Sequence, residues 1–264
     1  MTADLNFWRT VEPQDLFRAV AHEENRTFVI SVLRALTPDP VWTKRTITQV
    51  ELSWIETRCF VSWLARELQP KAYLEVGVRR GFTMAMVASR CPQVEIYGFD
   101  MWLPNYGDVH NPGPRFVQSE MERVGYKRKV NLISGNSHKR LPAFFRSSAA
   151  SFWDRVILNW KFKQRPPGFD LITIDGDHSL LGAYQDLLDT MVHCAVGGVI
   201  VFDDIAPDLS TLNPEAARSE KGEDPHGWGD LLGLWRAIQQ TYDNFRYFEY
   251  VGNPPGVGIA VRLK

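Results

Sequence analysis

The sequence predicts an α/β protein built on an open, mostly parallel β-sheet of about seven strands. Beyond Pro70, short runs rich in β-branched and aromatic residues alternate with helical stretches, which is the pattern of successive βαβ units. Two of these runs end in clusters of carboxylates, and ligands bind at the carboxyl ends of strands in such sheets. The last two runs are joined by the residues NPPG at 253–256, which predicts an antiparallel hairpin at one edge.

The residues before this alternation are predicted to be helical. Residues 10–24 and 48–69 place apolar side chains at spacings of three and four, which is the period of an amphipathic helix. Pro38 and Pro40 separate the two stretches. We therefore expect an N-terminal helical extension over residues 1–70 and a main α/β domain over residues 71–264.

Strands and helices are expected to alternate through the main domain. The predicted strands are residues 72–76, 95–99, 130–134, 171–174, 199–202, 246–251 and 256–263. Helices are predicted over residues 83–89, 115–124, 180–192 and 230–242. Two segments interrupt the pattern: residues 144–167 are interpreted as an insertion with a short element of its own, and residues 206–229 are polar and rich in glycine and proline. The second segment is either a lid over a site or a surface excursion.

Composition and charge narrow the class of partner. Thirty basic and 31 acidic residues give a formal net charge of −1, which favours a small molecule over nucleic acid or a membrane surface. The three cysteines, Cys59, Cys91 and Cys194, form no metal-binding pattern and are typical of reduced thiols in a cytoplasmic protein. No apolar run approaches the ~20 residues of a membrane span.

A glycine-containing turn follows the first predicted strand. Residues 75–83, with the sequence EVGVRRGFT, contain Gly77 and Gly81, which permit a tight turn and a close approach of backbone to ligand. The helix that begins near Thr83 offers free N–H groups at its start. Arg79 stands where a dinucleotide fingerprint has its middle glycine, so the turn disfavours a pyrophosphate ligand.

Residues at the ends of the next two strands are suited to binding a nucleoside. Asp100 lies about 20 residues beyond the turn, where an acidic side chain can accept hydrogen bonds from both ribose hydroxyls. Met101 and Trp102 can pack on an adenine face, and the Asn136 amide can bond a base edge. The alternatives are a turn or capping role for Asp100 and plain packing for Met101 and Trp102.

Two carboxylate clusters follow neighbouring strand runs. Residues 171–174 lead into Asp175, Asp177 and His178, and residues 199–202 lead into Asp203 and Asp204. Because the carboxyl ends of parallel strands face one crevice, a hard cation or a substrate hydroxyl is expected between these clusters.

Taken together, the YLEVGVRRGFT turn, Asp100, IDGDHS and GGVIVFDDI resemble class I S-adenosylmethionine-dependent methyltransferases over about residues 70–264. The chain is most similar to the small-molecule O-methyltransferases of the macrolide-sugar and aminocoumarin type and to cephalosporin-hydroxylase-like proteins. The resemblance implies a Rossmann-like seven-stranded sheet. It also implies cofactor contacts by Glu75, Gly77, Gly81, Thr83, Asp100, Met101, Asn136 and Asp175, and a Mg²⁺ site formed by Asp175, Asp203 and Asp204.

The implied reaction is methylation of a hydroxyl on a small molecule such as a sugar or natural product. The general base is either Asp177, by resemblance, or His178, whose imidazole titrates near neutral pH. The alternative for Asp177 is capping of the helix that begins near Leu180. Two other functions stay open, a cephalosporin-hydroxylase-like scaffold protein and a non-catalytic nucleoside-binding module.

The acceptor pocket is predicted to involve the loop at residues 101–115 and several aromatic or histidine side chains. These are Tyr106, His110, His226, Trp228 and Trp235. A homo-oligomer that uses the N-terminal helices is expected by analogy.

Overall fold

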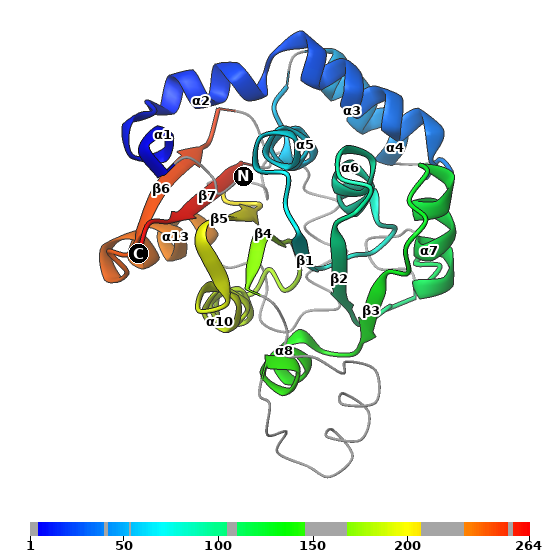
Figure 1. Cartoon of the computed structure of the whole chain (residues 1–264). Coiled ribbons are helices and arrows are strands. Elements are labelled where there is room, and N and C mark those ends of the chain that lie inside the picture. Colours follow the sequence, from blue (N-terminus) through cyan, green and yellow to red (C-terminus); the bar gives the residue numbers. More distant parts are fainter. Residues whose placement is uncertain are drawn as a thin grey trace.

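A computed structural model describes residues 5–39, 42–52, 54–104, 110–145, 168–206, 230–252 and 256–264. Within them lies one seven-stranded sheet in the order β3-β2-β1-β4-β5-β7-β6 (Figure 1). The strands are β1 (Ala72–Val76), β2 (Glu95–Asp100), β3 (Asn131–Ser134), β4 (Phe169–Ile174), β5 (Cys194–Asp203), β6 (Phe245–Tyr250) and β7 (Val257–Arg262). The predicted fold class, a mostly parallel sheet with an antiparallel edge, is confirmed.

Strand pairing brings the predicted ligand-binding ends together. Strands β3, β2, β1, β4 and β5 are parallel neighbours, whereas β7 runs antiparallel to both β5 and β6. Val76 of β1 pairs with Phe99 of β2 and with Ile174 of β4. The carboxyl ends of these three strands therefore lie level at one edge of the sheet.

Helices cover both faces of the sheet. They are α1 (Leu5–Thr10), α2 (Pro13–Val20), α3 (Glu23–Ala35), α4 (Trp42–Glu51), α5 (Thr57–Leu68), α6 (Phe82–Arg90), α7 (Pro114–Arg123), α8 (Ser137–Phe145), α10 (Leu180–Met191) and α13 (Leu231–Thr241). Figure 1 shows α5, α6 and α7 on one face and α8, α10 and α13 on the other. Tyr73 and Leu74 of β1 enter separate core clusters on these two faces, as the alternation of side chains along a strand requires.

The helices before Pro70 share a hydrophobic core with one face of the sheet. Buried Trp8, Leu16 and Val29 belong to the same cluster as Val199 of β5. The Arg246 guanidinium of β6 also donates hydrogen bonds to the carbonyls of Trp8 (2.7 Å) and Val11 (2.6 Å). The division of the chain at residue 70 stays a prediction.

Several elements differ from the sequence-based expectation, among them the stretch 48–69, which is divided between α4 and α5. Strand β5 begins at Cys194 rather than Val199. Helix α8 was not predicted, and it contains Pro142 while burying Leu141 and Phe144. The predicted insertion at 144–167 contributes its first two residues to α8, and its remainder lies outside the described residues, as do residues 207–229 of the candidate lid.

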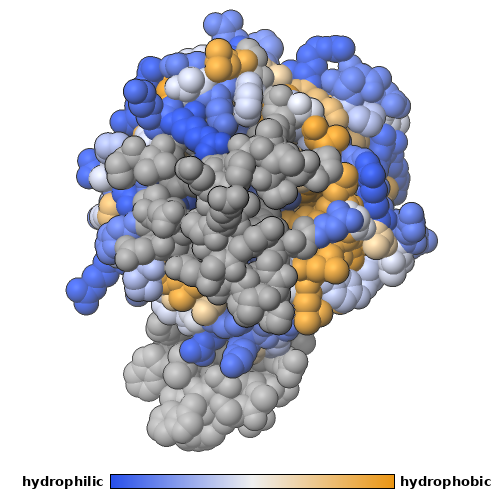
Figure 2. Space-filling view, turned by 180° about the vertical axis from the view of Figure 1, so that it is seen from behind, coloured by the Kyte–Doolittle hydropathy of each residue, from blue (hydrophilic) through white to orange (hydrophobic). Residues whose placement is uncertain are grey.

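Figure 2 shows exposed hydrophobic side chains gathered in one area of the face opposite that of Figure 1. All three cysteines are buried and free. Among the helices described, none has the length and apolar character needed to cross a membrane.

Candidate active site

The turn after β1 passes very close to the end of β4. Gly77 has a φ of 86°, and a Cβ built there would lie 1.7 Å from the carbonyl oxygen of Asp175. Gly81 has a φ of 76° and is the N-cap residue of α6, while Arg79 between them has a φ of 50°. Glycine is required at Gly77 both by the left-handed backbone and by the close approach of the two strands.

Asp100 faces this turn from the end of β2. Its carboxylate accepts hydrogen bonds from the backbone N–H of Arg79 (2.7 Å) and from that of Trp102. Thr83 is buried in the first turn of α6, and Met101, just beyond Asp100, is 50% exposed. The structure thus brings Asp100 to the glycine turn, where it also has the turn role given as its alternative; its contact with a cofactor stays a prediction.

Asn136 and Glu75 have structural partners within the same region. The Asn136 side-chain oxygen accepts a hydrogen bond from the His138 N–H (2.9 Å), so Asn136 caps the start of α8. Glu75 is buried on β1 and lies within hydrogen-bond distance of the Tyr73 hydroxyl (3.0 Å). Burial raises the pKa of Glu75, and the Tyr73 hydrogen bond opposes this rise. Their assignment to cofactor binding stays a prediction.

Three side chains at the ends of β4 and β5 converge on one point. His178 Nε2 lies 2.8 Å from Asp204 Oδ2 and 3.4 Å from Asp175 Oδ1. One ligand atom from each residue lies within 4.8 Å of the other two. The side chains are one-third exposed or less, so the group has an open side and a buried side.

Asp203 is oriented toward the protein interior. Its Oδ1 accepts hydrogen bonds from the Thr57 hydroxyl and from the Asp204 N–H (2.8 Å). Asp204 has a φ of 62°, an uncommon backbone conformation for a residue other than glycine. Burial, followed by the carboxylates of Asp204 and Asp175, raises the pKa of Asp203. Asp203 therefore braces the strained Asp204, and it is not part of the converging group found in the described residues.

Helix α5 supplies a positive charge that sequence reasoning missed. Arg58 forms an ion pair with Glu56, which is buried. Burial lowers the pKa of the Arg58 guanidinium, but the carboxylates of Glu56, Asp203 and Asp175 raise it by more, so that the pKa of Arg58 is raised overall. The available signal was the polar segment 56–58 inside an apolar helical stretch; the structure ends α4 at Glu51 and starts α5 at Thr57.

Asp177 takes a different position from His178. Its Oδ1 accepts the N–H of Ser179 (2.9 Å), and a Cβ built at Gly182 would lie 2.1 Å from its carboxylate. The Ser179 hydroxyl in turn accepts the N–H of Gly182. Asp177 thus packs on the first turn of α10, as the capping alternative expects, and His178 is the member of the pair that meets Asp175 and Asp204.

A buried carboxyl lies beneath this loop. Asp186 of α10 is fully buried, with Oδ1 lying 3.6 Å from His138 Nε2. Burial raises the pKa of Asp186 from its ordinary 3.8 to about 6. The carboxyl ionises at lower pH in the unfolded chain, so the stability that it contributes is present below pH ~4 and is lost as the pH rises through ~6.

We expect Asp186→Asn to remove this pH dependence. The free energy of unfolding of the variant, relative to wild type, should rise by about 3 kcal/mol between pH 4 and pH 8. Urea denaturation of both proteins across this range measures the difference. A difference that does not change with pH would contradict the prediction.

The predicted pocket residues fall into two groups. Tyr106, His226 and Trp228 lie outside the described residues. Trp235 was expected to offer a stacking surface, but this prediction is wrong, because Trp235 is fully buried and packs on Phe202 in the core. His110 is exposed, and its carbonyl accepts a hydrogen bond from Arg80 (3.4 Å).

Comparison with known families identifies the chain. Residues 74–205, half of the 264 residues, match a family described as a methyltransferase domain. The chain belongs to this methyltransferase family. The match runs from β1 to just beyond Asp204, so it spans the glycine turn and the converging acidic group. The resemblance of the sequence to class I methyltransferases is confirmed by this match and by the seven-stranded sheet.

Solved structures support the fold of this methyltransferase. PaMTH1 from Podospora anserina, bound to S-adenosylhomocysteine, has 13% identity and a TM-score of 0.53, with 91% of this chain and 88% of that chain covered. TomG from Streptomyces achromogenes, an O-methyltransferase in complex with S-adenosylmethionine, has 14% identity and a TM-score of 0.53, covering 87% and 92%. An O-methyltransferase from Bacillus cereus has 14% identity and a TM-score of 0.51, covering 98% and 96%. A search of curated protein sequences found no match to this chain.

Proposed function

We propose that this methyltransferase transfers a methyl group to a hydroxyl of a small molecule, with a divalent cation at the group Asp175, His178 and Asp204. The observation that carries the proposal is the convergence of these three side chains within 4.8 Å, at the same sheet edge as the glycine turn. TomG and the Bacillus cereus protein, which share the fold, are both named O-methyltransferases, and TomG is involved in tomaymycin synthesis.

The turn and Asp100 fit the cofactor. Gly77 and Gly81 both have the left-handed backbone conformation that favours glycine, and the Asp100 carboxylate lies beside this turn at the end of β2. S-adenosylmethionine, when bound, supplies a methyl group already activated on sulfur, so the protein must mainly align and deprotonate the acceptor.

The converging group fits a divalent cation. Two carboxylates and an imidazole are common ligands of first-row metals, and the mixed set suits Mn²⁺ or Fe²⁺ at least as well as Mg²⁺. The sequence predicted Asp203 as a ligand; the hydrogen bonds to Asp203 favour His178 in its place. A cation bound there would supply Lewis acidity that lowers the pKa of a nearby acceptor hydroxyl.

Three side chains around this group, those of His178, Arg58 and Asp203, have separate roles. His178 Nε2 lies within reach of both carboxylates and would complete the ligand set with them. Arg58 reduces the repulsion among the clustered carboxylates. Asp203 fixes the backbone of Asp204 through the hydrogen bond to its N–H.

Exposed apolar side chains at the same edge suit an acceptor with an apolar portion. Met101 and Leu103 follow β2, while Leu180 and Leu181 lie in the first turn of α10, just after the His178 loop. Leu181 is 75% exposed, which is a large apolar area to leave in water next to a polar group. A hydroxylated aromatic or glycosylated natural product matches this combination.

Chelation tests the cation. We expect treatment with EDTA to lower methyl transfer from labelled S-adenosylmethionine to a panel of hydroxylated acceptors by at least about 100-fold. Mn²⁺ or Mg²⁺ should restore the activity, while binding of S-adenosylhomocysteine survives chelation. Mn²⁺ binding followed by calorimetry should be lost in Asp204→Asn and kept within a few-fold in Asp203→Asn.

Two results would overturn parts of this proposal. Full turnover after chelation would remove the cation from the reaction. Cofactor binding without transfer to any acceptor of the panel would favour a nucleoside-binding module instead.

A further inference from the structure

The conformation of the cofactor turn depends on support from outside the turn. Gly77, Arg79 and Gly81 all have positive φ values, and the one at Arg79 is unfavourable for a residue with a side chain. The Arg79 N–H is held by the Asp100 carboxylate. The next residue, Arg80, donates a hydrogen bond to the His110 carbonyl (3.4 Å) and is also contacted by a part of the chain that precedes the sheet.

Arg80 points into the protein and not into solvent. Its side chain is 10% exposed and its guanidinium lies over the ring of Phe116, 4.6 Å from the centroid. Its Nε lies 3.6 Å from Oδ2 of Asp39, whose side chain is fully buried. A buried guanidinium needs a paired carboxylate, because an uncompensated buried charge is strongly unfavourable.

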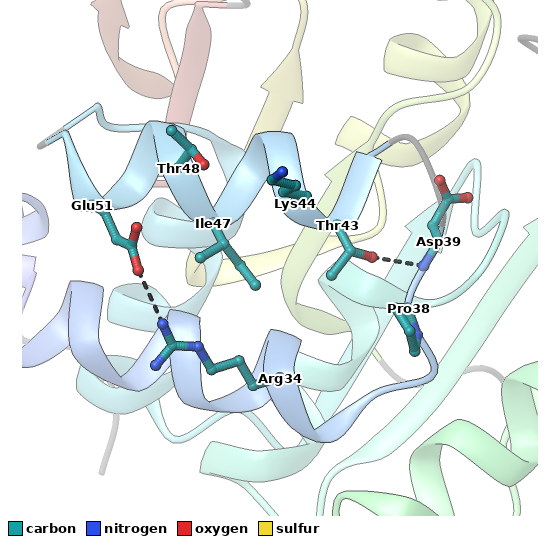
Figure 3. Close-up of a pocket in the computed structure, with 8 residues that line it drawn as sticks. All are labelled: Arg34, Pro38, Asp39, Thr43, Lys44, Ile47, Thr48 and Glu51. Atoms are coloured by element: carbon teal, nitrogen blue, oxygen red, sulfur yellow. Dashed lines mark hydrogen bonds and ion pairs between the residues drawn. The ribbon is translucent and has the colours of Figure 1, made fainter.

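Asp39 belongs to the segment 36–39 between α3 and α4, which we call the strap. Thr37 of the strap donates two hydrogen bonds, from its N–H (2.6 Å) and its hydroxyl (2.8 Å), to the buried carboxylate of Glu120 on α7. The Asp39 N–H donates to the Thr43 hydroxyl (2.7 Å) on α4 (Figure 3). Both ends of the strap are therefore fixed before Asp39 meets Arg80.

We infer that the strap is part of the cofactor site and that Asp39 is a positioning residue for it. Through Arg80, Asp39 holds the turn in the conformation that receives S-adenosylmethionine. The inference rests on the proposed role of this turn in cofactor binding, but not on the cation or on the acceptor.

The same region of the molecule supplies a matched control. A groove of about 490 Å³ between α3 and α4 has Asp39 and Thr43 at one end and the Arg34–Glu51 ion pair (3.0 Å) at the other (Figure 3). That pair is largely exposed and lies away from the strap, so breaking it disturbs α3 and α4 without touching the turn.

The experiment measures S-adenosylhomocysteine binding by calorimetry, without metal or acceptor, for wild type, Asp39→Asn and Glu51→Gln. We expect Asp39→Asn to weaken binding by about tenfold and Glu51→Gln to leave it unchanged. In steady-state assays Asp39→Asn should raise the KM for S-adenosylmethionine by a similar factor, with kcat at saturation within about twofold of wild type. Thermal unfolding shows whether each variant is folded.

Several results would overturn the inference. One is wild-type affinity in folded Asp39→Asn, and another is an equal loss in Glu51→Gln. A drop in kcat with unchanged KM would do the same. If Asp39→Asn does not fold, Thr43→Val is measured in its place, because it removes only the acceptor for the Asp39 N–H. A twofold to threefold loss of S-adenosylhomocysteine affinity in this variant supports the role of the strap. Unchanged affinity refutes it. Wild-type protein that does not bind S-adenosylhomocysteine would refute both this inference and the proposed function.

Discussion

Replacing His178 with alanine is expected to lower kcat by roughly three orders of magnitude while leaving S-adenosylhomocysteine affinity within about twofold. The reason is that His178 Nε2 lies 2.8 Å from Asp204 and 3.4 Å from Asp175, so its loss removes a ligand of the proposed cation and leaves two carboxylates facing each other. Single-turnover methyl transfer, together with calorimetry for the cofactor product, measures both quantities.

Asp177→Asn is the matched control for His178→Ala. Because asparagine keeps the Oδ1 acceptor for the Ser179 N–H, the variant should lose less than about 1 kcal/mol of stability and keep kcat within a few-fold. If instead Asp177→Asn loses as much activity as His178→Ala, Asp177 also takes part in the reaction and is not a capping residue alone.

The second large effect is expected for Gly77→Ala. A left-handed alanine costs about 1 kcal/mol, and its Cβ would overlap the Asp175 carbonyl, which lies on the neighbouring strand's end. The turn and the end of β4 would have to separate, so we expect the free energy of unfolding to fall by more than about 4 kcal/mol, with cofactor binding lost. Chemical denaturation and calorimetry test these two effects.

Gly125→Ala separates the backbone effect from the overlap. Gly125 has a φ of 88°, very close to that of Gly77, but a Cβ there would meet nothing within 4 Å. We expect this variant to lose only the backbone cost of about 1 kcal/mol and to bind the cofactor normally. Equal losses in the two variants would show that the contact with Asp175 is unimportant.

Much of the fold followed from local patterns. The runs that became β1, β2 and β4 are buried on both faces, and such continuous apolar runs mark parallel strands. The turn at 253–256 predicted an antiparallel edge, and β7 confirmed it. Helix α8 was missed because Pro142 and the polar start at Ser137 masked a short helix, whose stability comes from burying Leu141 and Phe144.

The site was only partly visible in the sequence. The proximity of Asp175, His178 and Asp204 could be predicted, because each residue follows a strand and parallel strands end at one edge of the sheet. The contacts of Thr57 and Asp39 could not be predicted, because Thr57 lies 146 residues from its partner Asp203 and Asp39 lies 41 residues from Arg80. Such contacts depend on how helices pack, and helix periodicity fixes only which face is apolar.

The position of β7 has a consequence for synthesis of the protein. This strand lies between β5 and β6, although both precede it in the chain. Until residues 257–262 leave the ribosome, a nascent chain exposes the hydrogen-bonding edge of β5, with Val199, Ile200 and Val201 awaiting their partners. The sheet can close only once residues 257–262 are available, so a chain truncated near residue 256 would be prone to pair with another copy of itself.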